Sequence, residues 1–343
     1  MNYELETMPK IHLHCHLDGA VTLPIMRELL ELSEIPFEED IRHMRELRDE
    51  ELSKLIMAGP ECRSLPDFLS CFDPVLKVLQ TPEQIRCCAR EVIRNAKAEG
   101  VIYLEIRFAP LLHCRGNLSP EEVVESFLKG MREGELKEGV ITRGILIAMR
   151  DDTQEKALEV LSLAEKYRNE GIVGIDIAGN EAPFPPKKFA VLWEEAKKKR
   201  IPFTIHAGEC TDASYVKQAL EFGADRIGHG IRAIEDGDLQ MELARKKICL
   251  EICPTSNLVT ASARNYLEIG IRRFMNLQIP VSVSTDDPGI IGTDLRREYK
   301  ILETEFGFGA WEFRYITDSA IESCFAGEEI KKILREKVCK YWG

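Results

Sequence analysis

The sequence predicts one α/β domain, a (β/α)8 barrel of the TIM type, on three observations. Eight short apolar runs rich in Val and Ile alternate with helical patterns, as in parallel strands joined by crossover helices. Eight is the number of strands that closes such a barrel. Polar clusters follow these runs, and the C-terminal ends of barrel strands carry the active site. We therefore expect the clusters to meet at one rim.

The predicted strands follow one another along the chain. They cover residues 11–16, 101–108, 142–148, 172–178, 202–206, 226–229, 248–252 and 281–284. Helix signals lie between them: Thr81 and Ser119 each precede a proline and stand three residues before Gln84 or Glu122, the spacing of a capping box. No linker rich in Pro, Gly or Ser divides the sequence, so we expect one domain over residues 1–343.

The interval between the first two predicted strands is too long for one crossover. About eighty residues separate these strands, whereas a usual crossover needs far fewer. The excess, roughly residues 37–79, carries Leu65, Phe68, Leu69 and Phe72 at helical spacing. These side chains could form an apolar lid over the rim, or they could dock an extra helix on the barrel. Spacing alone favours the docked helix.

Composition and charge exclude several classes of partner. The chain has 343 residues, 44% of them hydrophobic, and a net charge of −12, which argues against nucleic acid and anionic membranes as partners. Residues 1–9 lack the apolar core of a signal peptide, and no apolar run approaches the ~20 residues of a membrane span. We expect a cytoplasmic protein whose eleven scattered cysteines are free thiols. The sequence does not predict an oligomeric state.

Three histidines and one aspartate suggest a metal site. His14 and His16 end the first predicted strand and, by alternation, point the same way. His206 ends the fifth strand and Asp286 lies just past the eighth. This donor set suits Zn²⁺ with water as a further ligand, although iron, nickel or manganese could take the same ligands.

Other polar residues at the rim suit proton transfer. His229, between two glycines, could be a further nitrogen ligand, but a catalytic role is the better interpretation. Glu209 can exchange a proton with a substrate if its pKa is raised. Asp286 and Asp287 should diverge, one toward the metal and the other toward the substrate. His12 is expected on the inner face, one step deeper than His14, and His113 is expected at the surface or rim.

Seven motifs together carry a resemblance to the adenosine deaminases of the metal-dependent amidohydrolase superfamily. The resemblance covers nearly the whole chain. The motifs are His14-Cys15-His16-Leu17-Asp18-Gly19-Ala20, Ser64-Leu65-Pro66-Asp67-Phe68-Leu69, Asp176-Ile177-Ala178-Gly179, His206-Ala207-Gly208-Glu209, Gly228-His229-Gly230, Cys253-Pro254-Thr255-Ser256-Asn257 and Ser284-Thr285-Asp286-Asp287-Pro288. The other class of zinc deaminase, with His-x-Glu and Pro-Cys-x-x-Cys, has no match here.

The resemblance implies a role for individual residues. One Zn²⁺ would be held by His14, His16, His206 and Asp286, and His16 would also border the substrate. Glu209 would donate a proton to purine N1, while His229 and Asp286 would assist the zinc-activated water. The substrate would be bound at Asp287 through N7, at the Gly179 N–H through N3 and at Asp18 through a ribose hydroxyl. The resemblance also implies an apolar gate of Leu65, Phe68, Leu69 and Phe72, which overturns the docked-helix interpretation.

The implied activity is hydrolysis of adenosine to inosine and ammonia, and of 2′-deoxyadenosine to 2′-deoxyinosine and ammonia. An alternative is another 6-aminopurine: adenine, N6-methyl-AMP or aminodeoxyfutalosine. Relatives of the adenine type carry glutamate where Asp18 stands here, which favours adenosine. Asn180 replaces an aspartate common in the family and leaves its effect on the purine site open. A third hypothesis, a secreted signalling protein on this fold, is disfavoured because such relatives carry a signal peptide and an N-terminal extension.

Overall fold

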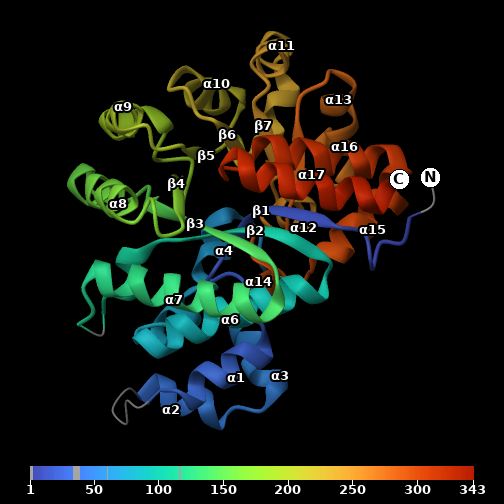
Figure 1. Cartoon of the computed structure of the whole chain (residues 1–343). Coiled ribbons are helices and arrows are strands. Elements are labelled where there is room, and N and C mark those ends of the chain that lie inside the picture. The colour runs from blue at the N-terminus through green and yellow to red at the C-terminus, as the bar shows by residue number, and fades with distance from the viewer. Residues whose placement is uncertain (1–2, 34–38, 60, 116) are drawn as a thin grey trace.

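Eight parallel strands form the centre of the computed structural model, which describes residues 3–33, 39–59, 61–115 and 117–343 (Figure 1). The strands are β1 (Lys10–His16), β2 (Val101–Phe108), β3 (Ile141–Met149), β4 (Ile172–Ala178), β5 (Thr204–Ala207), β6 (Arg226–His229), β7 (Cys249–Ile252) and β8 (Val281–Val283). All eight predicted strands are present, and β2, β4 and β6 have the predicted bounds. The predicted α/β class is confirmed.

The strands form two parallel sheets that meet on both sides. The sheet orders are β1-β2-β3-β4 and β5-β6-β7-β8. A bridge between Ile175 and Phe203 joins β4 to the chain at β5, and a bridge between Cys15 and Asp286 joins β1 to the chain after β8. At this second seam the His16 N–H donates to the Asp286 carbonyl at 2.9 Å. The seam of the barrel therefore runs through two predicted metal ligands.

Helices lie outside the strands and connect them (Figure 1). They are α1 (Leu23–Glu31), α2 (Glu39–Glu46), α3 (Asp49–Ile56), α4 (Leu65–Ser70), α5 (Asp73–Val78), α6 (Pro82–Ala98), α7 (Pro120–Glu138), α8 (Gln154–Lys166), α9 (Ala190–Lys199), α10 (Ala213–Glu221), α11 (Gly237–Lys246), α12 (Pro254–Val259), α13 (Ile271–Asn276), α14 (Pro288–Ile291), α15 (Leu295–Phe306), α16 (Ala310–Ser323) and α17 (Glu328–Trp342). Short 3-10 helices span Pro110–His113, Pro186–Phe189, Ile231–Glu235 and Tyr266–Ile269. The predicted capping boxes begin α6 and α7, where Thr81 and Ser119 accept the Gln84 and Glu122 N–H groups.

The long interval before β2 holds four short helices, α2 to α5, between α1 and α6. The predicted start of this insertion, residues 37–38, lies outside the described residues. Leu65 and Phe68 of α4 form a small apolar cluster with Ile290 of α14. Because α14 directly follows Asp287, this cluster places α4 beside the C-terminal rim of the barrel.

The other end of the barrel is closed by the C-terminal helices. The Phe325 ring, between α16 and α17, lies 3.7 Å from the Arg226 guanidinium at the start of β6. The last helix also contacts the first described residues, since the Glu4 N–H donates to the Tyr341 hydroxyl at 3.0 Å. Within the described residues, no helix is long and apolar enough to cross a membrane. All eleven cysteines are free thiols in the described chain.

Candidate active site

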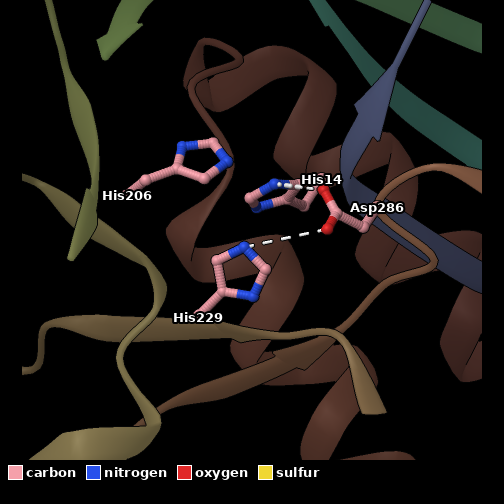
Figure 2. A group of neighbouring side chains, drawn as sticks. All are labelled: His14, His206, His229 and Asp286. Atoms are coloured by element: carbon pink, nitrogen blue, oxygen red, sulfur yellow. Dashed lines mark ion pairs between the residues drawn. The ribbon is translucent and has the colours of Figure 1, made fainter. Parts of the chain in front are cut away.

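Four predicted ligands converge at the C-terminal rim. The Asp286 Oδ1 atom lies 3.0 Å from His14 Nε2 and 3.2 Å from His16 Nε2. These two nitrogens are 3.3 Å apart, and the His206 ring lies 4.6 Å from the His14 ring, centroid to centroid. Figure 2 shows His14, His206, His229 and Asp286 pointing toward one another from different elements, and their donor atoms lie within 4.8 Å of each other. The side chains predicted as metal ligands therefore lie close together in the structure.

Carboxylates behind the histidines fix their tautomers. His14 Nδ1 lies 2.7 Å from Glu251 Oε2, and His206 Nδ1 lies 2.9 Å from Asp176 Oδ2. The Glu251 carboxylate accepts, so His14 Nδ1 carries the proton and its Nε2 presents a lone pair to the cluster. The Asp176 carboxylate beside His206 Nδ1 favours the same tautomer there. Burial lowers the pKa of both imidazoles, that of His206 to about 3, which keeps them neutral. Neutral imidazole is the form that binds metals.

The cluster fits a metal ion because lone pairs of imidazole nitrogens and of a carboxylate oxygen face one another with no hydrogen-bond donor of the described chain between them. The lone pair of His14 Nε2 points at Asp286 Oδ1, which itself finds no hydrogen-bond donor among the described residues. Burial opposes ionisation of Asp286, and positive charge on the surrounding imidazoles lowers the pKa of its carboxyl group well below the usual range. With His14 neutral, that positive charge has to come from a bound cation. An ionised carboxylate beside imidazole lone pairs calls for a cation between them.

His229 differs from the other histidines of the cluster. Its Nδ1 lies 3.1 Å from the amide nitrogen of Asn257, which donates, so Nε2 carries the proton. That Nε2 lies 3.8 Å from both Glu209 Oε2 and Asp286 Oδ2. Burial lowers its pKa, but Glu209 and Asp286 outweigh burial and raise it. A protonated Nε2 between two carboxyl groups suits proton transfer better than metal ligation. His229 also has a left-handed backbone, with φ of 57°, which is uncommon outside glycine.

Two carboxyl groups at the rim have raised pKa values, which favours their protonated form. Burial, reinforced by Asp286 and Glu181, raises the pKa of Glu209 to about 6 against the attraction of His229. Burial and the adjacent Asp286 raise the pKa of Asp287 well above its usual value. The Asp287 Oδ1 atom has no hydrogen-bond partner among the described residues. Both groups can therefore donate a hydrogen bond to a ligand.

A cavity of about 450 Å³ lies over this cluster. Of the predicted site residues, His14 alone is absent from its lining and lies beneath it. The predicted residues that line the cavity are His16, Asp18, Leu65, Phe68, Leu69, Phe72, Gly179, His206, Glu209, His229, Asp286 and Asp287. Phe68 and Phe72 meet edge to face with ring centroids 5.8 Å apart, so α4 and α5 supply an apolar wall. Gly179, with φ of 104°, occupies a conformation that favours glycine.

Sequence reasoning missed a network of buried charges below the cluster. Arg107 donates to Asp176 at 2.7 Å and to Glu251 at 2.8 Å, so it holds both carboxylates that orient the histidines. Arg226 pairs at 2.6 Å with Glu251 and with Glu105. The signal was present in the sequence, because a charged residue inside an apolar strand run must find a partner within the barrel.

One further contact was also missed, and two histidines lie elsewhere than expected. Ser256 donates to Asp286 Oδ2 at 2.7 Å, and it belongs with Asn257 to a motif that received no role. His12 is buried, as expected, but not on the inner face, and His113 is not at the surface. His12 lines a separate cavity together with Cys15, because the β1 register shifts between these two residues. His113 is fully buried, with Nδ1 2.9 Å from the Leu79 carbonyl oxygen.

Comparisons with known proteins identify the family of the whole chain. Residues 9–341 match the family model described as adenosine deaminase. The adenosine deaminase of Enterococcus faecalis is 36% identical over 331 residues, which cover 96% of each chain. Among solved structures, an adenine deaminase from Arthrobacter aurescens and an N6-mAMP deaminase from Arabidopsis each give a TM-score of 0.86 at 27% identity, over 98% of this chain and 99% of theirs. The chain belongs to the adenosine deaminase family and has its hydrolase fold.

Proposed function

We propose that this protein hydrolyses adenosine and 2′-deoxyadenosine to inosine or 2′-deoxyinosine and ammonia, with one Zn²⁺ per chain. The observation that carries the proposal is the juxtaposition of metal donors with carboxyl groups whose pKa is raised. Histidine lone pairs converge on Asp286 Oδ1, and beside them burial raises the pKa of Glu209 to about 6. A cavity large enough for a nucleoside opens above both.

The proposed metal ligands are His14, His16, His206 and Asp286. Three nitrogens and one carboxylate oxygen in a buried site suit zinc, and the protonated Nε2 leaves His229 outside the ligand set. Bound zinc would lower the pKa of a water molecule to about 7 and so supply hydroxide near neutral pH.

The protein's own residues would activate the purine ring. Attack at C6 breaks aromaticity, and protonation of N1 lets the ring accept the electron pair. Glu209 donates that proton, because its buried carboxyl group retains it to a higher pH than an exposed glutamate does. Asp287 donates to N7 and the Gly179 N–H donates to N3, which orients the ring. His229 holds a proton beside the reacting centre, and loss of ammonia then leaves the 6-oxopurine.

The remaining cavity residues would bind the sugar and exclude water. Asp18 is buried at the cavity wall, where its carboxylate can accept a hydrogen bond from a ribose hydroxyl. Leu65, Phe68, Leu69 and Phe72 would cover the purine as a lid contributed by the insertion at residues 37–79 of a single domain. Closing such a lid removes water from the site.

A second candidate is deamination of another 6-aminopurine. The solved structures of an adenine deaminase and an N6-mAMP deaminase match this fold with a TM-score of 0.86, so the barrel alone does not select adenosine. Asp18 decides between them, because its carboxylate would repel a 5′-phosphate and would lose its partner with free adenine.

One experiment tests both candidates. Ammonia release is followed with adenosine, 2′-deoxyadenosine, adenine, AMP and N6-methyl-AMP, and metal content is measured by elemental analysis. We expect about one zinc per chain and the highest kcat/KM with the nucleosides. His206→Ala should lose metal and activity together. A preference for adenine or a nucleotide would replace the adenosine proposal, and full metal content in His206→Ala would remove this ligand.

A further inference from the structure

Glu181 is a buried carboxylate that the mechanism above does not use. It follows β4 on the loop that begins with Gly179, and only 1% of its surface is exposed. Its Oε1 accepts the Gly208 N–H at 2.5 Å, and its Oε2 accepts the Glu209 and Cys210 N–H groups at 3.1 and 3.0 Å. Three consecutive N–H groups thus converge on one carboxylate, in the manner of an anion-binding nest.

The turn that Glu181 binds is the turn that carries Glu209. Gly208 has a left-handed backbone, with φ of 65°, so the chain reverses sharply directly after β5. The carbonyl side of the same turn is held separately, since the Gly208 oxygen accepts the Arg232 N–H at 3.1 Å. Arg150 donates to the carbonyls of His206 and Phe184 and lies near enough to Glu181 for their charges to interact. Glu181 therefore fixes the N–H side of this turn.

We propose that Glu181 is a positioning residue, which holds the Gly208-Glu209-Cys210 turn and thereby aims the carboxyl group of Glu209 at the substrate. The proposal rests on the acid role proposed above for Glu209. The Glu209 side chain starts from a backbone N–H that Glu181 binds directly, and its carboxyl group lies 3.8 Å from His229 Nε2. A shift of this turn moves the acid relative to the ring nitrogen while the four metal ligands stay in place.

Glu181→Gln tests the role because it preserves shape and changes the acceptors. The amide offers one oxygen, and its NH₂ group would face a backbone N–H that also donates. At least one buried N–H then loses its partner, and the turn must shift to find another. A misplacement of about 1 Å can cost on the order of 100-fold in rate. We expect kcat to fall by about 10–100-fold, with KM and zinc content close to wild type.

A double-mutant cycle separates positioning from general damage. If Glu181 acts through Glu209, adding Glu181→Gln to Glu209→Gln should change kcat by less than about threefold, because the acid is already absent. An equal loss in both backgrounds would overturn the proposal, and so would a loss confined to KM or to zinc content. Glu99→Gln is the matched control. Glu99 is a half-buried carboxylate that accepts the Leu295 N–H at 2.8 Å between α6 and α15, and this variant should keep wild-type kcat.

Hydrogen exchange provides a readout that does not depend on activity. In Glu181→Gln the amides of residues 208–210 should exchange faster than in wild type, while the strands keep their protection. Unchanged protection of this turn would overturn the proposal whatever the kinetics show. If wild-type protein lacks deaminase activity but the exchange result is as expected, then the proposed function fails and the role of Glu181 in holding the turn stands.

Discussion

Glu251 and Glu209 are two buried glutamates of the same barrel with opposite electrostatic surroundings. Burial opposes the charge of Glu251, but Arg107 and Arg226 outweigh it and hold its pKa well below the usual range. Glu209 has no arginine partner among the described residues, and burial raises its pKa to about 6. The interior of the barrel therefore lowers the pKa of Glu251, whereas the rim raises the pKa of Glu209 and of Asp287.

This difference in pKa allows neighbouring carboxyl groups to perform two tasks: those inside the barrel orient the histidines, and those at the rim donate to the substrate. The interior carboxylates face the Nδ1 atoms of His14 and His206, so they must stay ionised to favour the proton on Nδ1 and keep each Nε2 free for a metal. The rim carboxyl groups must donate, so they need burial without a directly paired arginine or lysine. Substitutions inside the network should therefore damage stability and metal binding, and substitutions at the rim should damage turnover while the fold persists.

The largest effect is expected from Glu209→Gln. The amide keeps the shape of the side chain but cannot supply the proton, and general acid catalysis contributes about 10²–10⁴-fold. We expect kcat to fall within that range while zinc content and the urea midpoint of unfolding stay near wild type. Turnover close to wild type would remove Glu209 from the mechanism and would place it with the structural carboxylates.

The pH profile sharpens this comparison. An acid must be protonated to act, and the pKa of Glu209 is raised to about 6. Below that pH the group is protonated in most molecules, and above it the protonated fraction falls about tenfold per pH unit. We expect kcat/KM for adenosine to decline on the alkaline side through this group, and we expect Glu209→Gln to lack that limb. An identical profile in both proteins would assign the limb to another group.

Arg107→Met should produce the next largest effect, a loss of free energy of unfolding. Methionine retains an unbranched stem without the charge, so Asp176 and Glu251 lose a shared partner inside the barrel. Removing one member of a buried ion network typically costs about 3–5 kcal/mol. Urea unfolding measures the loss. Arg48→Met is the control, because Arg48 pairs with Glu51 at the surface and its loss should leave the urea midpoint near wild type. Equal costs would show that the buried network contributes no more than a surface pair.

The contrast between rim and interior also explains what the sequence could predict. Strand positions and rim residues were accessible because apolar runs alternate with helices and polar motifs follow each run, as at His206 or Asp286. The partners of Arg107 were not accessible, since they lie on β4 and β7 and only closure of the barrel brings them together. Alternation also failed for His12, because a register shift in β1 depends on the neighbouring strand.

Asp18→Ala should have a smaller effect that depends on the substrate. A hydrogen bond to a charged group is worth about 1.5–3 kcal/mol, which corresponds to roughly 10–150-fold in kcat/KM if it is fully expressed in the transition state. We expect that loss with adenosine and almost none with adenine, which lacks the ribose. Steady-state assays with both substrates measure the difference. Equal losses with adenosine and adenine would mean that Asp18 supports the site rather than the sugar.

The smallest effect is expected at the apolar wall, where Phe72→Ala isolates covering of the purine from packing of the fold. Phe68 is 2% exposed and packs on Leu65 and Ile290, so its truncation would lower stability by about 3–5 kcal/mol. A change in ligand binding could then not be separated from partial unfolding.

Phe72 is half-buried, lines the cavity and meets Phe68 edge to face, so its loss should mainly admit water above the ring. An aromatic contact of this kind contributes about 0.5–1.5 kcal/mol, and Kd for an apolar purine analogue should rise by roughly 2–12-fold. Titration calorimetry measures this, with Phe306→Ala, a half-buried aromatic truncation in α15, as the control. If both variants bind the analogue as wild type does, α4 and α5 pack against the barrel without covering the substrate, and exclusion of water at the rim must come from other residues.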